Sequence, residues 1–346
     1  MHMDRIVTFG EIMLRLKAPG FERFFQSPSF EATFGGGEAN VAVSLSLFGK
    51  KSSFVTALPD GPLGNAALSE LARYGVDTSF ARRMPGRLGI YFLECGADQR
   101  PSNVVYDREG SSISRAGGDS FDWNAVFAGA TWFHLTGITP ALSASAAEAS
   151  LRAATAARAS GCTVSIDLNY RKKLWNYGKK ASEVMRGLVA LADVVVANEE
   201  DVQKCLGIEA PGVDVASGEL DSGAYRALAE RVRSEFPNLS RVAVTLRESR
   251  SADRNGWSAV LSSPSGFCSS RRYDIDDIVD RVGGGDAFSA GLIFALLEYP
   301  GDDRRALEFA AAASCLKHSI PGDFNLCTRE EVEALLAGNS SGRVNR

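Results

Sequence analysis

The sequence has 346 residues, enough for one large domain or two of ordinary size, either with a substantial core. Hydrophobic residues make up 45% and charged residues 23%, which is typical of an ordinary globular protein. The formal net charge of -4 argues against a nucleic-acid or anionic-membrane partner, and no apolar run is long enough to span a bilayer. Six cysteines without CxxC spacing, and no signal peptide, indicate a reduced, cytoplasmic protein.

The first part of the chain alternates apolar runs with glycine-led helices. Residues 6–9 suit a first buried strand, and residues 54–58 suit a second one. Helices are expected directly after three glycines at 35–37 and again over 63–74. Residues 11–34 mix Pro, Gly, Phe and charge without a helical period, so we expect extended segments that leave the main body.

A hairpin is predicted from two β-prone runs, 88–95 and 103–106, joined by the polar stretch CGADQRPSN. Together with the extended segments before it, this hairpin would form a small separate sheet. The predicted lid is therefore made of the inserted segments 11–34 and 87–115.

From residue 132 onward strands and helices alternate regularly. Apolar strands are expected at 132–135, 163–167, 194–197 and 242–246, separated by helices at 143–159, 181–191 and 224–236. This alternation predicts a mostly parallel sheet covered by helices on both faces, a three-layer α/β/α sandwich.

The last part of the chain continues the same domain. Two edge strands are expected at 257–261 and 271–274, and helices at 306–317 and 330–336. Without an internal repeat or a long linker, one α/β domain over 1–338 is preferred to two serial domains, followed by a polar tail at 339–346.

The stretch DRVGGGD at 280–286 is the strongest chemical feature of the sequence. Three consecutive glycines, Gly283, Gly284 and Gly285, let the backbone approach a ligand closely, and the apolar run AFSAGLIFALL after them predicts a buried helix. The free N–H groups and dipole at the start of such a helix form an anion site. A carboxylate beside bound anions would repel them, so Asp286 is best interpreted as a base that takes a proton from a group being phosphorylated.

Polar residues follow three strands at the carboxyl edge of the predicted sheet, where ligands of α/β proteins bind. Arg171 offers a fork of donors for phosphate or carboxylate, with a surface ion pair as the alternative. Asn198, Glu200 and Asp201 form an oxygen-rich cluster that suits Mg²⁺ held partly through water. The same cluster is equally well explained as a helix N-cap with acidic residues beside it.

Two further groups of residues could face a substrate. The glycines at 35–37 lack GxGxxG spacing, so they are interpreted as a close backbone approach to a polar ligand, with Asn40 pointing inward. Tyr91, Tyr106 and Arg108 alternate in the lid, which places Tyr106 and Arg108 on one side. An aromatic edge with a guanidinium suits an acidic sugar, although a solvated hairpin face would show the same pattern.

These motifs resemble the two signatures of the ribokinase-like (PfkB) family of carbohydrate kinases. DRVGGGD resembles its C-terminal signature, with Arg281 and Gly284 in place of the usual Thr and Ala, and GGGEANVA followed by Gly49 resembles its N-terminal one, with Pro59 in place of a glycine. The resemblance extends over nearly the whole chain. Within the family, GEIMLRL, VVYDREGS, DLNYRKKLW, ANEED and TLRES are most similar to 2-keto-3-deoxygluconate kinases.

The resemblance implies a ribokinase-like domain with a β lid that transfers the ATP γ-phosphoryl group to the sugar acid and gives its 6-phosphate. Asp286 would be the base, with the amides of Gly283, Gly284 and Gly285 as the charge-stabilising hole. The implied substrate positions are Gly36, Asn40, Tyr91, Tyr106, Arg108, Arg171 and Asp323. The implied nucleotide positions are Asn169, Arg171, Asn198, Leu246, Arg247, Gly283 and Gly285. The family's NxxE motif is only partly kept, because Asp201 stands where its glutamate would be.

Several alternatives stay open at this point. Many relatives hold a monovalent cation beside the anion hole. Arg281 stands in this loop without an evident role in the mechanism, so the resemblance does not decide whether this chain binds such a cation. A homo-oligomer is expected by resemblance, through apolar lid residues. The substrate could instead be fructose, ribose or 5-dehydro-2-deoxygluconate, or the chain could be a silent sugar-binding regulator. An NAD-dependent enzyme is disfavoured by the lack of GxGxxG after the first strand.

Overall fold

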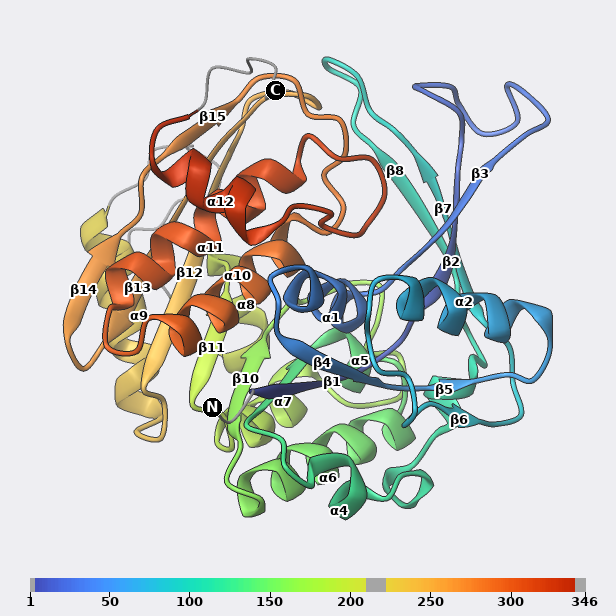
Figure 1. Ribbon diagram of the computed structural model, residues 1–346, viewed down its shortest axis with the longest axis horizontal. Coiled ribbons are helices and arrows are strands. Elements are labelled where there is room, and N and C mark those ends of the chain that lie inside the picture. The colour runs from blue at the N-terminus through green and yellow to red at the C-terminus, as the bar shows by residue number, and fades with distance from the viewer. Residues whose placement is uncertain (1–3, 210–221, 340–346) are drawn as a thin grey trace.

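The computed structural model describes residues 4–209 and 222–339, so apart from Asn339 the predicted tail lies outside the described residues. Its centre is a nine-stranded sheet, with β12, β11, β10, β9, β1 and β4 mutually parallel and β13 antiparallel to β12, β14 and β15 (Figure 1). In order across the sheet the strands are β14 (Gly266–Ser269), β13 (Asn255–Ser263), β12 (Arg241–Ser249), β11 (Val194–Ala197), β10 (Thr163–Asp167), β9 (Trp132–Thr136), β1 (Arg5–Phe9) and β4 (Lys51–Val55), with β15 (Tyr273–Ile275) also paired to β13.

Helices cover both faces of this sheet, as the alternation of elements predicted. One face carries α1 (Gly37–Leu47), α10 (Gly284–Glu298), α11 (Asp303–Lys317) and α12 (Arg329–Leu336). The other carries α4 (Trp123–Phe127), α6 (Ala144–Ala159), α7 (Ala181–Val189), α8 (Glu199–Leu206) and α9 (Ser222–Glu235). The three-layer α/β/α sandwich is therefore confirmed.

Alternating side chains divide each strand between two hydrophobic cores. In β11, Val194 and Val196 pack with the α10 and α11 side, whereas Val195 and Ala197 pack with the α6 and α7 side. This is the two-residue period of a strand that is buried on both faces. Helix α10 is apolar nearly all round, because it is enclosed by the sheet, α1 and α11.

A separate sheet of four strands projects from the body, in the order β3 (Glu31–Gly35), β2 (Met13–Lys17), β7 (Gly89–Glu94) and β8 (Asn103–Asp107) (Figure 1). It contains the predicted antiparallel hairpin of β7 and β8, and it joins two segments distant in the sequence through the parallel pair β2 and β7. At the end of the second segment, α3 (Ser112–Arg115) packs against α6 and against β5 (Ala57–Leu58) of the body.

The structure differs from the expected elements in a few short pieces. The run 54–58 is divided into β4 and β5 (Ala57–Leu58), and β5 pairs with β6 (Arg82–Arg83). The remaining helices are α2 (Pro62–Arg73), α5 (Ile138–Ala141) and a 3₁₀ turn at Gly118–Ser120. In the part of the chain described, no helix is long and apolar enough to cross a membrane. All six cysteines are free thiols.

Candidate active site

Asp286 lies in the first turn of α10, directly after the glycine turn. Gly283, the residue before the helix, has a φ of 85°, a left-handed conformation that favours glycine. A Cβ at this position would also lie 2.1 Å from the carbonyl oxygen of Asp323, so both the fold and the backbone conformation require glycine here. The Gly284 amide donates within the turn to the Arg281 carbonyl at 3.3 Å, whereas Gly285 is exposed.

The Asp286 carboxylate is oriented by Asn40 from the facing helix α1. Asn40 Nδ2 donates to Asp286 Oδ2 at 2.6 Å, and Asn40 Oδ1 accepts from the Gly36 amide at 3.2 Å, which fixes the orientation of the side-chain amide. Burial raises the pKa of Asp286 to about 6, and the hydrogen bond from Asn40 and the Arg171 cation oppose this rise. A carboxyl group with this pKa is ionised at neutral pH and still able to accept a proton.

Gly36 precedes α1 and has little room for a side chain. An added Cβ would lie 2.0 Å from the carbonyl oxygen of Glu11, so the packing of two backbones already explains the glycine. Glu38, in the first turn of α1, accepts from the amide and hydroxyl of Thr136 and from the hydroxyl of Thr139, each at 2.9 Å. Glu38 therefore fastens the start of α1 to the end of β9, beside the site.

A third buried carboxylate, Asp167, stands at the carboxyl end of β10. Its Oδ2 accepts from Ser289 Oγ of α10 at 3.4 Å. Burial raises its pKa well above the ordinary range, and the nearby charges of Asp201 and Asp286 raise it further. Asp167, Asp201 and Asp286 therefore share one electrostatic environment at the sheet edge where ligands were expected.

Asn198 and Asp201 form a reciprocal capping box at the start of α8. Asn198 Oδ1 accepts from the Asp201 amide at 2.8 Å, and Asp201 Oδ2 accepts from the Asn198 amide at 3.1 Å. Asp201 Oδ1 accepts from the Tyr170 amide at 2.8 Å. The capping alternative thus accounts for these two residues, and of the expected metal set only Glu200 is exposed.

The expected nucleotide residues lie along the same edge. Asn169 follows β10 with a φ of 39°, and Arg171 is exposed, with one hydrogen bond to the Tyr170 carbonyl at 2.9 Å. Leu246 is buried in β12, whereas its neighbour Arg247 is exposed. Burial raises the pKa of Asp167, Asp201 and Asp286, and the Arg171 cation opposes this rise in each, so its charge lies close enough to act on all three.

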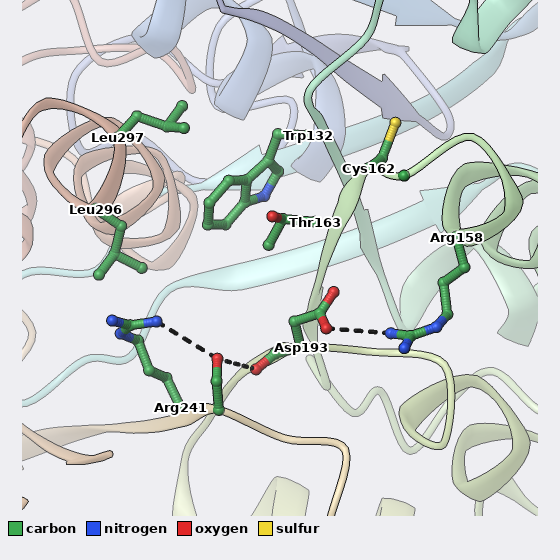
Figure 2. Close-up of a pocket in the computed structure, with 10 residues that line it drawn as sticks. Trp132, Arg158, Cys162, Thr163, Asp193, Arg241, Leu296 and Leu297 are labelled. Carbon is green, nitrogen blue, oxygen red and sulfur yellow. Dashed lines mark hydrogen bonds and ion pairs between the residues drawn. The ribbon is translucent and has the colours of Figure 1, made fainter. Parts of the chain in front are cut away.

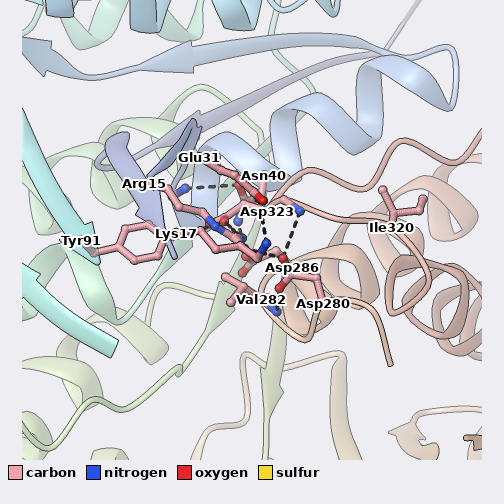
Figure 3. A network of polar contacts seen from close by, with 12 residues as sticks. Arg15, Lys17, Glu31, Asn40, Tyr91, Asp280, Val282, Asp286, Ile320 and Asp323 are labelled. Atoms are coloured by element: carbon pink, nitrogen blue, oxygen red, sulfur yellow. Dashed lines mark hydrogen bonds and ion pairs between the residues drawn. The ribbon is translucent and has the colours of Figure 1, made fainter. Parts of the chain in front are cut away.

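Tyr91 and Asp323 meet at the base of the small sheet, in a buried ionic network (Figure 3). The Tyr91 hydroxyl donates to Asp323 Oδ1, which also accepts from Arg15 Nη1 at 2.7 Å. Arg15 Nη2 donates to Asp280, the first residue of DRVGGGD. The network therefore connects the lid to both loops that surround the glycine turn.

Arg108 forms a buried ion pair with Glu11. Arg108 lies just beyond the end of β8, and its Nε and Nη2 both donate to Glu11 Oε2, the first at 2.8 Å. Tyr106 is 42% exposed and lies opposite Tyr91, with ring centroids 5.9 Å apart. The Arg108 guanidinium lies 5.5 Å from the Tyr106 ring centroid. The three predicted lid residues are therefore neighbours, although Arg108 points toward Glu11.

Arg281 has a structural role that its position in the sequence did not suggest. Its Nε donates to the Ala252 carbonyl at 2.8 Å, and its Nη2 donates to the Ser251 carbonyl and to Asn255 Oδ1. The guanidinium therefore fastens the glycine turn to the loop between β12 and β13. That loop follows β12, the strand that carries the expected nucleotide residues Leu246 and Arg247.

The buried charged residues that connect the elements around the site were not identified from the sequence. They are Glu38, Arg15, Asp280 and Lys317. Glu38 and Asp280 stand inside the two motifs, so their positions were visible but their partners were not. Arg15 and Lys317 are fully buried charged residues, and only the apolar residues around them in the sequence could have indicated this.

A pocket of about 540 Å³ lies at the opposite edge of the sheet (Figure 2). It is lined in part by Trp132, Thr163 and Arg241, the first residues of three strands. Arg158 pairs with Asp193 at 3.1 Å, and Arg241 Nε pairs with Asp303 at 2.6 Å. None of the expected site residues lines this pocket, which is separate from the site around Asp286.

Comparisons with known proteins agree on one family. The profile of the pfkB family carbohydrate kinases matches residues 3–230. The structure is similar to that of a 2-dehydro-3-deoxygluconokinase from Thermotoga maritima, with 47% sequence identity and a TM-score of 0.91 over 97% of this chain and 100% of that one.

Two curated relatives extend over the same length. A 2-dehydro-3-deoxygalactonokinase from Haloferax volcanii is 34% identical over 97% of this chain and 98% of its own length. A 2-dehydro-3-deoxygluconokinase from Thermoproteus tenax is 31% identical over 96% of this chain and 94% of its own length. With a family profile over most of the chain and relatives that match it end to end, the protein belongs to the pfkB family of carbohydrate kinases.

Proposed function

We propose that this kinase transfers the γ-phosphoryl group of ATP to 2-keto-3-deoxygluconate and gives the 6-phosphate. The observation that carries the proposal is the buried Asp286, held by Asn40 at 2.6 Å at the start of α10. The substrate class is supported by the names of the Thermotoga maritima and Thermoproteus tenax relatives. Because the Haloferax volcanii relative is named for the galacto epimer, that sugar acid is the nearest second candidate.

The sugar hydroxyl oxygen would attack the γ-phosphorus and form the new P–O bond, while the bond to the bridging oxygen of ADP breaks. The hydroxyl proton goes to the Asp286 carboxylate, and ADP leaves with the electron pair of the broken bond. Amides at the glycine turn would stabilise the charge on the transferring group, and the exposed Arg171 guanidinium would clamp phosphate or the substrate carboxylate. The small sheet would act as a lid that excludes water.

Mg²⁺ is part of this proposal, and the donor set fits an ion held mainly by phosphates and water. Among the residues that the structure describes, no group of three or more His, Cys, Asp or Glu side chains is placed to hold a metal ion. Asp167, with its long bond to Ser289, and the exposed Glu200 are the carboxylates that would hold the ion. Mg²⁺ commonly binds through one or two carboxylates together with substrate phosphates, whose charge it neutralises.

The decisive test is ADP release measured over a panel of sugars. The panel contains 2-keto-3-deoxygluconate, its galacto epimer, 5-dehydro-2-deoxygluconate, fructose and ribose. We expect the two keto-deoxy acids to give a kcat/KM at least about tenfold above the neutral sugars, because the Arg108 and Arg171 guanidinium groups have further N–H donors for a carboxylate. A preference for fructose or ribose would contradict the proposed substrate, and no turnover with any sugar would favour the silent regulator.

The pH dependence of the reaction should report the state of Asp286. The base must be ionised to accept the proton, so kcat/KM should fall as the pH drops below the pKa of Asp286, about 6. Rates measured from about pH 5 to about pH 8 check this. Arg171→Gln should move the acid limb to higher pH, because the Arg171 cation lowers that pKa. A flat profile through pH 6 would contradict the assignment of Asp286 as the base.

Arg108→Ala should raise KM for the acid substrate about tenfold or more, with KM for ATP changed much less. A charge-assisted contact is worth roughly 1.5 to 3 kcal/mol, and a guanidinium has five N–H donors, of which Glu11 uses those on Nε and Nη2. Steady-state kinetics with each substrate varied in turn provide the measurement.

Arg87→Ala is the matched control for this prediction. Arg87 is another arginine beside the lid, paired in the open with Asp107 through two contacts of 2.6 Å. Its removal should leave both KM values within about twofold, since exposed pairs contribute little. Equal effects of Arg108→Ala on the KM for sugar and for ATP would mean that Arg108 holds the lid and does not bind the substrate.

The proposal includes assembly into a homo-oligomer through the lids. Val105 on β8 of the projecting sheet is 47% exposed, and Phe21 and Phe25, in the segment between β2 and β3, are 58% and 80% exposed. Exposed apolar surface of this kind supports contact with a second copy.

A further inference from the structure

Lys317 is a lysine with no exposed surface, at the last position of α11. Lysine is almost never fully buried without a partner, because taking an ammonium out of water is costly. The two hydrogen bonds of its Nζ within the described chain go to main-chain carbonyl oxygens, to Ile320 at 3.1 Å and to Asp280 at 3.5 Å. The ammonium therefore sits between two loops, without the direct carboxylate contact that buried lysines commonly make.

These two loops are the ones that shape the active site. The first loop runs from Asp280 into the glycine turn, and a Cβ on Gly283 would lie 3.3 Å from Lys317 Cε. The second loop carries Ile320 and leads to Asp323 (Figure 3). Asp280 also accepts from the Gly322 amide at 3.0 Å, and the Val279 amide donates to the His318 carbonyl at 2.9 Å. Lys317 thus lies behind the glycine turn, in a frame that joins both loops.

Burial lowers the pKa of Lys317, and the carboxylates around it oppose this fall and favour the protonated form. These carboxylates belong to Asp280, Asp323 and Asp286, whereas the Arg15 cation lowers the pKa further. The three buried carboxylates are balanced by only two buried cations, Arg15 and Lys317. Loss of the ammonium charge would therefore leave a large excess of negative charge beside a site that must bind phosphate. In return, the Lys317 cation opposes the rise that burial causes in the pKa of Asp286.

A positive charge held by main-chain carbonyl oxygens has the ligand set that proteins otherwise provide for a monovalent cation. We propose that the Lys317 ammonium is a built-in monovalent cation that holds the glycine turn in its anion-binding shape, so that this kinase works without added K⁺ or Na⁺. Lys317 is then a positioning residue, which acts on the transferring group through the turn. This inference rests on the proposed function, in which that turn binds the transferring phosphoryl group.

The first experiment needs no variant. Wild-type turnover is compared at constant ionic strength in tetramethylammonium, sodium, potassium and ammonium salts. We expect rates within about twofold of one another, because the cation position is already filled by the side chain. Activation of about tenfold or more by K⁺ would overturn the proposal, since it would require a separate cation site.

The second experiment removes the side chain and returns a free cation. Lys317→Ala should lower kcat about 100-fold, the scale of losing one preorganised charge-stabilising contact, and ammonium or K⁺ should restore at least about tenfold of that loss. Lys317→Met keeps the volume without a charge or a cavity, so it should lose activity equally and resist rescue. Lys50→Met is the matched control, because Lys50 is also largely buried but pairs with Asp4 and Glu298 away from the site.

Nucleotide binding separates this inference from the substrate assignment. Calorimetry should show that Lys317→Ala loses about tenfold in affinity for a non-hydrolysable ATP analogue and less than about threefold for ADP, with ammonium restoring the difference. This readout needs no sugar, so it decides the role of Lys317 even if every sugar acid fails as a substrate. If one Lys317 variant does not fold, the other variant and the wild-type salt series still test whether the ammonium acts as the built-in cation. Failure of cations to rescue a folded Lys317→Ala would mean that the lysine only fills space.

Discussion

Asp286→Asn is expected to lower kcat by about 1,000-fold or more while the affinity for ATP changes less than about threefold. Asparagine keeps the shape of the side chain and can still accept the Asn40 hydrogen bond through its Oδ1, so the loss is confined to proton acceptance. Stopped assays of sugar phosphate formation measure the turnover, and calorimetry measures nucleotide binding.

The control for this variant is Asp277→Asn, an exposed carboxylate nine residues earlier in the same segment. It should leave kcat within about twofold, because an exposed charge outside the site contributes little. Turnover of Asp286→Asn within about tenfold of the wild type would mean that another group accepts the proton. Asp167 would then be the next candidate, as a buried carboxylate that accepts from Ser289 of α10.

Asp286 could be predicted because its function depends on neighbours in the sequence. Three glycines and an apolar run define a turn and a buried helix without any knowledge of the rest of the chain. The regular strands and helices after residue 132 could be predicted for the same local reason. The short strand β14 could not, since an edge strand of four residues, Gly266–Ser269, is too short to show a period.

The network behind the site depends instead on contacts between distant residues. Arg15 is 308 positions from Asp323 and 265 positions from Asp280 in the sequence. Nothing in an alternating strand such as MLRLK indicates which polar side chain turns inward to meet a partner that distant. In the sequence, Lys17 and Arg15 are equivalent cations on one face of β2, yet only Arg15 is fully buried.

Asn198 and Asp201 illustrate a different limit. Side-chain oxygens at the start of a helix serve equally well to cap the backbone and to bind a cation, so the residue types alone left both interpretations open. Only the two short bonds between Asn198 and Asp201, at 2.8 and 3.1 Å, favour capping. Arg281 could not be interpreted for a similar reason, because its partners are main-chain carbonyls of another loop.

The same network makes Arg15→Met the variant with the largest expected effect on stability. The Arg15 guanidinium is buried between Asp280 and Asp323, and removing one partner of a buried ion pair leaves uncompensated charge. Such a loss costs about 3 to 5 kcal/mol of the free energy of unfolding. Urea unfolding followed by circular dichroism measures this, and ATP binding by the folded fraction shows whether the glycine turn keeps its shape.

Lys17→Met tests whether the loss of stability in Arg15→Met arises from the burial of the Arg15 ion pairs or from the loss of any cation from β2. Lys17 lies two residues further along the same strand and pairs with Glu31, whose side chain is 52% exposed. Because an exposed partner remains solvated when the cation is lost, this variant should cost about 1 kcal/mol or less. Adding Asp280→Asn to Arg15→Met should recover part of the lost stability, since it removes one of the stranded charges. Equal costs for the two single variants would mean that Arg15 does not hold the lid and the loop before the glycine turn together.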